Sequence, residues 1–106
     1  MLPKKKRITK DIFPDILKNG KILSGSLFTL RYKASKQAQF AFVAPKTVVK
    51  QAVSRNKLRR QGYNALAKSP KIPNIIGLFF YKKEAKNASF SDIKQDIHAL
   101  LSKISL

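Results

Sequence analysis

The chain has 106 residues, no cysteine, and 23 lysines and arginines against five aspartates and glutamates, for a net charge of +18. This length suits one domain over residues 1–106, and a hydrophobic content of 43% excludes a disordered basic tail. No apolar run approaches the roughly 20 residues of a membrane span, and without cysteine there is no disulfide or thiolate zinc site. We therefore expect a single-domain cytoplasmic protein with a polyanionic partner.

The first predicted element is a short helix over residues 12–19. Asp11 is the expected N-cap, and Gly20 follows the last turn as the expected stop. The apolar side chains have the i, i+3, i+4 spacing of one helix face: Phe13, Ile16 and Leu17.

Strands are predicted from alternation and composition. Residues 27–32 place apolar and polar side chains on opposite faces, and residues 40–44 form a second strand after a polar connector. We expect these two strands to pair as an antiparallel hairpin, with a small extra strand near residues 22–23. Residues 75–81 are nearly all apolar, which is typical of a central strand covered on both faces.

Two longer helices complete the pattern and give the order αββαβα, an α+β sandwich. Residues 51–68 carry a stripe that we expect to be buried: Leu58, Gly62, Ala65 and Leu66. The opposite side carries Asn56, Lys57, Arg60 and Tyr63. In the last helix, Ser89 and Asp92 have the spacing of a capping box. Its apolar stripe is Phe90, Ile93, Ile97, Leu100, Leu101 and Ile104.

The charges are segregated along the chain. No acidic residue lies between Asp15 and Glu84, whereas that interval holds fifteen lysines and arginines. An unopposed basic block is typical of a phosphate-binding surface. Nucleic acid fits this block better than an anionic membrane surface, because no helix pairs a broad exposed apolar face with the basic one.

The carboxylates offer no catalytic or metal-binding set. They form two close pairs at i, i+4, Asp11 with Asp15 and Asp92 with Asp96, a spacing that a two-metal nuclease could use. Acids near the start of a helix more often complement its dipole, and we assign both pairs that role. His98 is the only histidine and is expected to face solvent. We therefore predict no catalytic residue and no metal ligand in the protein.

Residues 55–60, Arg-Asn-Lys-Leu-Arg-Arg, place four cations within six residues of a helix. Three of the chain's five arginines lie here, where planar bidentate contacts to phosphate favour arginine over lysine. Asn56 adds both a donor and an acceptor, and Leu58 is expected to face inward and hold the cations on a packed helix. This motif predicts a nucleic-acid-binding helix.

With this motif the chain resembles the protein subunit of bacterial ribonuclease P, a family that carries an Arg-Asn-Arg-x-Lys-Arg helix. The resemblance extends over about 100 residues in the family's order. Its segments are Met1-Leu2-Pro3 with Arg7-Ile8, Phe13 through Gly20, Ser24-Gly25 with Leu27-Phe28-Thr29-Leu30, Val43-Ala44-Pro45-Lys46, Lys50-Gln51-Ala52-Val53, residues 55–60, and Ser89-Phe90 with the closing helix.

The resemblance implies a ribosomal protein S5 domain 2-like fold with a left-handed βαβ crossover. It implies a subunit of the endoribonuclease that removes the 5′ leader of precursor tRNA to give the mature tRNA 5′ end. The RNA subunit is expected to carry the chemistry, with Mg²⁺ held mainly by RNA. The expected partners are one ribonuclease P RNA, in a 1:1 ribonucleoprotein, and precursor tRNA, with no membrane contact.

Site residues are carried over by position. The RNA-binding residues that the resemblance implies are Arg55, Asn56, Lys57, Arg59, Arg60, Lys46 and Lys50. The leader cleft that it implies contains Phe13, Leu17, Arg31 and Tyr32. Leu17 stands where the family often has an aromatic residue and Arg31 where it can have tyrosine, so weaker stacking of the leader is expected here.

Two other classes of function fit the charge and size. A structural RNA-binding protein, such as a small ribosomal protein, would bind RNA without restoring the cleavage of precursor tRNA. An autonomous metal nuclease would cleave RNA without any RNA subunit.

Overall fold

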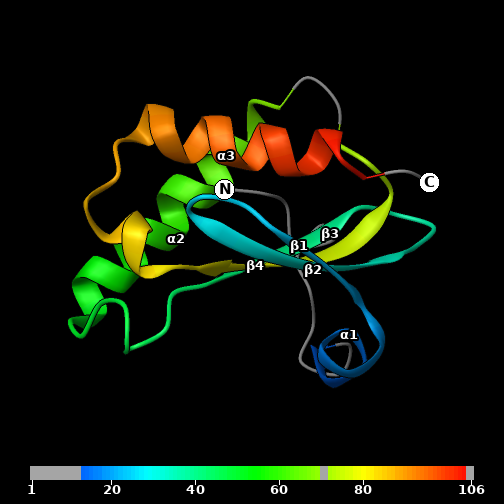
Figure 1. The fold of residues 1–106 in the computed structure, drawn as a ribbon, viewed down its shortest axis with the longest axis horizontal. Coiled ribbons are helices and arrows are strands. Elements are labelled where there is room, and N and C mark those ends of the chain that lie inside the picture. Colours follow the sequence, from blue (N-terminus) through cyan, green and yellow to red (C-terminus); the bar gives the residue numbers. More distant parts are fainter. Residues whose placement is uncertain (1–12, 70–71, 105–106) are drawn as a thin grey trace.

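The computed structural model describes residues 13–69 and 72–104, which form an α+β sandwich around a four-stranded sheet (Figure 1). The elements are α1 (Phe13–Asn19), β1 (Lys21–Ser24), β2 (Phe28–Ala34), β3 (Gln39–Val43), α2 (Ala52–Ala67), β4 (Ile75–Tyr81), the 3₁₀ helix η2 (Lys83–Asn87) and α3 (Phe90–Ser102). Helices α2 and α3 cover one face of the sheet, and α1 lies on the other (Figure 1). The predicted fold class is confirmed, whereas the expected N-cap Asp11 lies outside the described residues.

The strand order β1-β2-β4-β3 shows that the predicted hairpin is wrong. Strand β4 lies between β2 and β3, antiparallel to β2 and parallel to β3. An almost wholly apolar strand is most stable where both of its edges are paired and both faces are covered, so β4 takes the centre. The extra strand expected near residues 22–23 is β1, which pairs with β2. Strands β3 and β4 are then joined through α2 as a βαβ unit.

The main core fills the space between the sheet and the two helices α2 and α3. Its centre is a group of aromatic rings from β2, β3 and β4. Phe42 stacks on Phe79 with ring centroids 4.8 Å apart and an interplanar angle of 7°. Phe28 meets Phe79 edge-on at 5.6 Å. The buried residues of α2 are the predicted stripe, Leu58, Gly62, Ala65 and Leu66.

Helix α2 approaches the sheet most closely at Gly62. A Cβ atom placed there would lie 2.5 Å from the Phe42 ring and 2.6 Å from the hydroxyl oxygen of Tyr81. That hydroxyl donates a hydrogen bond to the carbonyl of Leu58, one turn earlier in α2. The glycine is therefore needed because rings of the sheet press directly on the helix backbone.

Helix α3 begins at the predicted capping box. The Asp92 N–H donates to Ser89 Oγ at 3.1 Å, and the Ser89 N–H donates to Asp92 Oδ2 at 3.4 Å. The stripe positions Ile93, Ile97, Leu100 and Leu101 are buried, as predicted. His98 differs from the prediction, because its ring is partly buried and its Nε2 is shielded from solvent.

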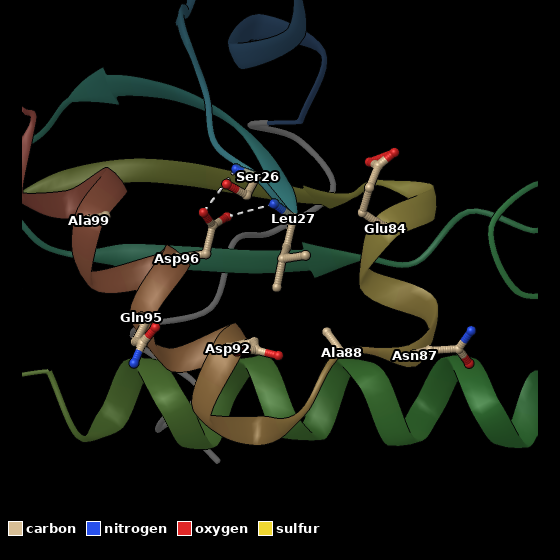
Figure 2. Close-up of a pocket in the computed structure, with 9 residues that line it drawn as sticks. All are labelled: Ser26, Leu27, Glu84, Asn87, Ala88, Asp92, Gln95, Asp96 and Ala99. Carbon is tan, nitrogen blue, oxygen red and sulfur yellow. Dashed lines mark hydrogen bonds between the residues drawn. The ribbon is translucent and has the colours of Figure 1, made fainter.

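Asp96 holds the turn between β1 and β2, a role that its assignment to the helix dipole missed. Its carboxylate accepts hydrogen bonds from the backbone N–H groups of Ser26, Leu27 and Phe28 at 2.9, 3.1 and 3.1 Å. Figure 2 shows this carboxylate reaching from α3 to the turn. A Cβ at Gly25 would lie 2.7 Å from Asp96 Oδ2, so the turn needs glycine there to admit the carboxylate.

Two leucine truncations test the packing of the helices. Leu100 is 1% exposed and Leu17 is 41% exposed. We expect Leu100→Ala to lower the free energy of unfolding by about 2–5 kcal/mol, and Leu17→Ala to change it by no more than about 0.5 kcal/mol. Urea unfolding of both variants measures the difference. Equal losses would show that α3 does not seal the core.

Candidate nucleic-acid interface

Cationic side chains gather on the first half of α2 and on the loop that precedes it. We call this surface the basic face: Lys46, Lys50, Arg55, Asn56, Lys57, Arg59 and Arg60. Arg55 and Arg59 are partly buried, and the other five side chains are exposed. Five residues of the predicted RNA-binding set thus lie on α2 and two on the loop before it, and their role as RNA ligands stays a prediction.

Arg55 holds the loop before α2 in place. Its Nη1 donates to the carbonyl of Lys50 at 2.6 Å and to that of Val49 at 3.3 Å. The side chain of Val49 is buried in the core, so these bonds tie the loop to the packed part of the protein. Arg55 therefore orients Lys50 relative to the helix.

Asn56 and Arg59 orient each other on the next turn. Arg59 Nη2 donates to Asn56 Oδ1, which leaves the Asn56 amide N–H groups available to a ligand. An ordered guanidinium loses less conformational entropy when it binds a phosphate than a free one. The asparagine thus positions a cation in addition to offering its own contacts.

Two residues of α2 depart from the expected arrangement. The sequence predicts Tyr63 on the side opposite the buried stripe, but its ring packs edge-on against Phe42 with ring centroids 4.9 Å apart. Val53, which is not in the predicted RNA-binding set, is 79% exposed in the first turn of the helix. Its spacing of three and four residues from Asn56 and Lys57 places it beside these polar side chains, so the basic face includes one apolar contact.

The second candidate surface is the face of the sheet on which α1 lies. Arg31 Nη1 donates to the carbonyl of Leu17 at 2.9 Å, so two of the predicted cleft residues lie together. Ile16 is fully buried, as is Leu78 on the same face of β4, and these side chains anchor α1. Phe13 is the first residue of α1, and its side chain lies outside the described part of the structure.

The assignment of Tyr32 to this cleft is wrong. Successive residues of a strand point to opposite faces, so Tyr32 and Arg31 lie on opposite sides of β2. Tyr32 is 8% exposed and belongs to the core between the sheet and the helices. Its ring therefore stabilises the fold and does not line the α1 face.

Asp15 provides a further link between α1 and the sheet. Its carboxylate accepts hydrogen bonds from Asn19 at 2.8 Å and from Lys33 of β2 at 3.0 Å. The hydrogen bond from Asn19, then the hydrogen bond and charge of Lys33, hold the pKa of Asp15 below its usual 3.8. At neutral pH this carboxylate is ionised and keeps α1 attached to β2.

Carboxylates gather on a different part of the surface. A pocket of about 540 Å³ lies between η2, the first turns of α3 and the β1–β2 turn (Figure 2). Glu84, Asp92 and Asp96 line it, together with Gln95 and Asn87. Because these acids would repel a phosphate backbone, the pocket marks a limit of the cationic surface.

Residues 13–69 and 72–104 contain no group of three or more histidine, aspartate and glutamate side chains that could hold a metal ion. Three of the acids have structural contacts instead: Asp15 with Lys33, Asp92 with the N-cap, and Asp96 with a turn. Within the same ranges, no helix has the length and apolar character needed to cross a membrane.

The fold and the basic face together define a class, a small α+β protein with a cationic surface suited to a polyanion. The sequence model described as Ribonuclease P matches residues 2–105, so the chain belongs to the ribonuclease P protein family. It is thus a protein subunit of ribonuclease P, which processes tRNA, and the family implies an RNA partner in a ribonucleoprotein. The chain matches no curated protein sequence.

Solved structures share the fold. The ribonuclease P protein from Thermotoga maritima superposes with a TM-score of 0.83 at 20% identity, over 94% of this chain and 98% of that one. The ribonuclease P protein from Staphylococcus aureus gives a TM-score of 0.78 at 20% identity, over 92% of this chain and 93% of that one. These likenesses confirm the predicted fold.

The link through Asp15 predicts a pH dependence. Because folding lowers the pKa of Asp15 below 3.8, the link contributes stability above that pH and loses it as the pH falls through the lower folded value. NMR titration of the Asp15 carboxyl should show the lowered pKa in the native chain and a higher one in Lys33→Met. The same pKa in both proteins would show that Lys33 does not hold the carboxylate.

The contacts of the basic face predict different effects for two of its arginines. Arg60→Ala should reduce the log–log salt slope of binding to a ribonuclease P RNA by about 0.7–0.9 and leave the melting temperature unchanged, because Arg60 is exposed. Arg55→Ala should also lower the melting temperature, since it releases two loop carbonyls. Salt titrations and thermal melts measure both effects. Identical behaviour of the two variants would contradict the positioning role of Arg55.

Proposed function

We propose that this chain binds the catalytic RNA of ribonuclease P through the basic face, and the 5′ leader of precursor tRNA on the α1 face of the sheet. One protein molecule would bind one RNA molecule. The observation that carries the proposal is the position of the basic face on a packed helix, with Arg55 and Arg59 oriented by hydrogen bonds. Cations fixed before binding lose little conformational entropy when phosphates dock against them.

In this proposal the RNA performs the cleavage. Hydrolysis of a phosphodiester with Mg²⁺ needs oxygen ligands that position the metal and its bound water. The protein's described residues do not fit that task, because Asp15, Asp92 and Asp96 hold α1, the α3 N-terminus and the β1–β2 turn. Mg²⁺ would therefore be held mainly by RNA, and the protein would supply cations and a surface for the leader.

The α1 face supplies a site for the leader that lies apart from the basic face. Leu17 is partly exposed there, and the guanidinium of Arg31 is fixed beside it by the bond to the Leu17 carbonyl. A single strand that crossed this face could place phosphates near Arg31 and bases against apolar side chains. Mature tRNA has no leader, so this contact would favour precursor over product.

Reconstitution tests the proposed function. Added to a bacterial ribonuclease P RNA, the protein should restore cleavage of precursor tRNA at a magnesium concentration too low for the RNA alone. The double variant Lys57→Ala/Arg60→Ala should lose most of this effect, because both side chains are exposed on the basic face.

A matched control removes the same charge elsewhere. The double variant Lys94→Ala/Lys103→Ala takes two cations from α3 and its C-cap, and it should behave like the wild type. If the wild-type protein bound the RNA without restoring cleavage, the chain would be a structural RNA-binding protein. Cleavage by the protein alone would show an autonomous nuclease.

A further inference from the structure

The α1 face of the sheet carries an aromatic side chain that none of the assignments above uses. Phe80 of β4 alternates with Phe79 and Tyr81, which are buried in the core, so its ring points to the α1 face. In the sheet register Phe80 lies between Thr29 of β2 and Val43 of β3. All three side chains are only partly buried.

Helix α1 is attached to the neighbouring rows of the sheet, which contain Arg31 with Leu78 and Lys33 with Ile76. Its contacts are the bond from Arg31 to the Leu17 carbonyl and the ion pair of Lys33 with Asp15. Phe80 lies two residues beyond Leu78, about 7 Å further along the strand. In Figure 1, α1 lies under one part of the sheet, and β4 continues past it toward η2.

Phe80 is the one aromatic side chain on this face among those the structure describes. Two other rings are partly buried on the helical side: Tyr63 packs on Phe42, and Phe90 lies under the ammonium of Lys68 at 5.1 Å. Within residues 13–69 and 72–104, Phe80 has no ring–ring or cation–ring partner. No other ring or cation of the described residues therefore engages its π-face.

Cations lie close to this row in the chain. Lys83 follows Phe80 by three residues and Lys46 follows Val43 by three residues, and both are exposed. The loop that begins after β3 carries Lys46 and leads to the basic face. An aromatic ring flanked by phosphate-binding cations is the arrangement by which proteins hold single-stranded nucleic acid. The charge of this end of the sheet favours an RNA strand as its occupant.

We propose that Phe80 is a stacking platform for one base of the 5′ leader of precursor tRNA, with Thr29 and Val43 on either side of the base. This inference rests on the proposed function and adds to it a leader-binding residue and the path of the leader across the sheet. The leader would pass from Leu17 and Arg31 along β4 to Phe80. Its phosphates would then lie near Lys83 and, where the leader reaches the edge of the basic face, near Lys46.

Fluorescence of a base analogue tests the stacking directly. Precursor tRNAs carry 2-aminopurine at one leader position at a time and are bound to the reconstituted holoenzyme. Stacking on a ring quenches this fluorophore, so one position, or two adjacent ones, should be quenched with the wild-type protein and bright with Phe80→Val. Quenching that is the same in the variant would overturn the proposal.

Affinity provides a second measurement. The ratio of the dissociation constants for mature and precursor tRNA should fall by about 5- to 150-fold in Phe80→Val, the effect of losing one stacked base. Valine is compatible with a strand, so the fold should persist, and thermal melts monitor it. Phe80→Trp keeps a ring and should retain the ratio, which separates stacking from the filling of space.

Phe90→Val is the matched control, because it removes a partly buried ring from the helical side of the sheet. The ratio of the dissociation constants for mature and precursor tRNA should be the same in this variant as in the wild type. Two results would overturn the role of Phe80 and leave the proposed function intact. One is an unchanged ratio of dissociation constants in Phe80→Val, and the other is an equal fall of that ratio in Phe90→Val. A wild-type holoenzyme that did not discriminate precursor from mature tRNA would overturn the proposed function and this inference with it.

Discussion

The close contact between α2 and the sheet at Gly62 is the constraint on which the rest of the structure depends. The helix backbone lies against the Phe42 ring and the Tyr81 hydroxyl, which donates to the Leu58 carbonyl. This contact fixes both the distance of α2 from the sheet and its rotation. With the rotation fixed, Asn56, Lys57 and Arg60 face outward, so the packing of the core determines where the basic face lies.

The sheet divides the protein into two surfaces with different tasks. In β2 and β4, one set of alternate residues builds the aromatic core under the helices. The other set forms the α1 face, where Arg31, Leu78 and Phe80 lie. A shift of one residue in the register would exchange these sets. The core and the proposed leader surface therefore depend on the same pairing of strands.

Three of the five acidic residues serve the fold. Asp15 ties α1 to β2, Asp92 caps α3, and Asp96 holds three backbone N–H groups of the β1–β2 turn. These three carboxylates are thus used within the protein, at sites remote in sequence from residues 55–60. Among the described residues, no ion pair to an acid neutralises the basic face, which suits a surface for a phosphate backbone.

Local structure could be predicted from the amino-acid sequence: the helices, the capping box at Ser89, the buried stripe of α2 and the basic motif. All of these depend on residues within a few positions of one another. It also carried the family resemblance. The strand order, the burial of Tyr32 and the partner of Asp96 could be known only from the folded protein. These depend on contacts between distant segments. The local pattern of β2 and β3 allows a hairpin, but β4 competes for both of their edges and, being apolar on both faces, takes the centre.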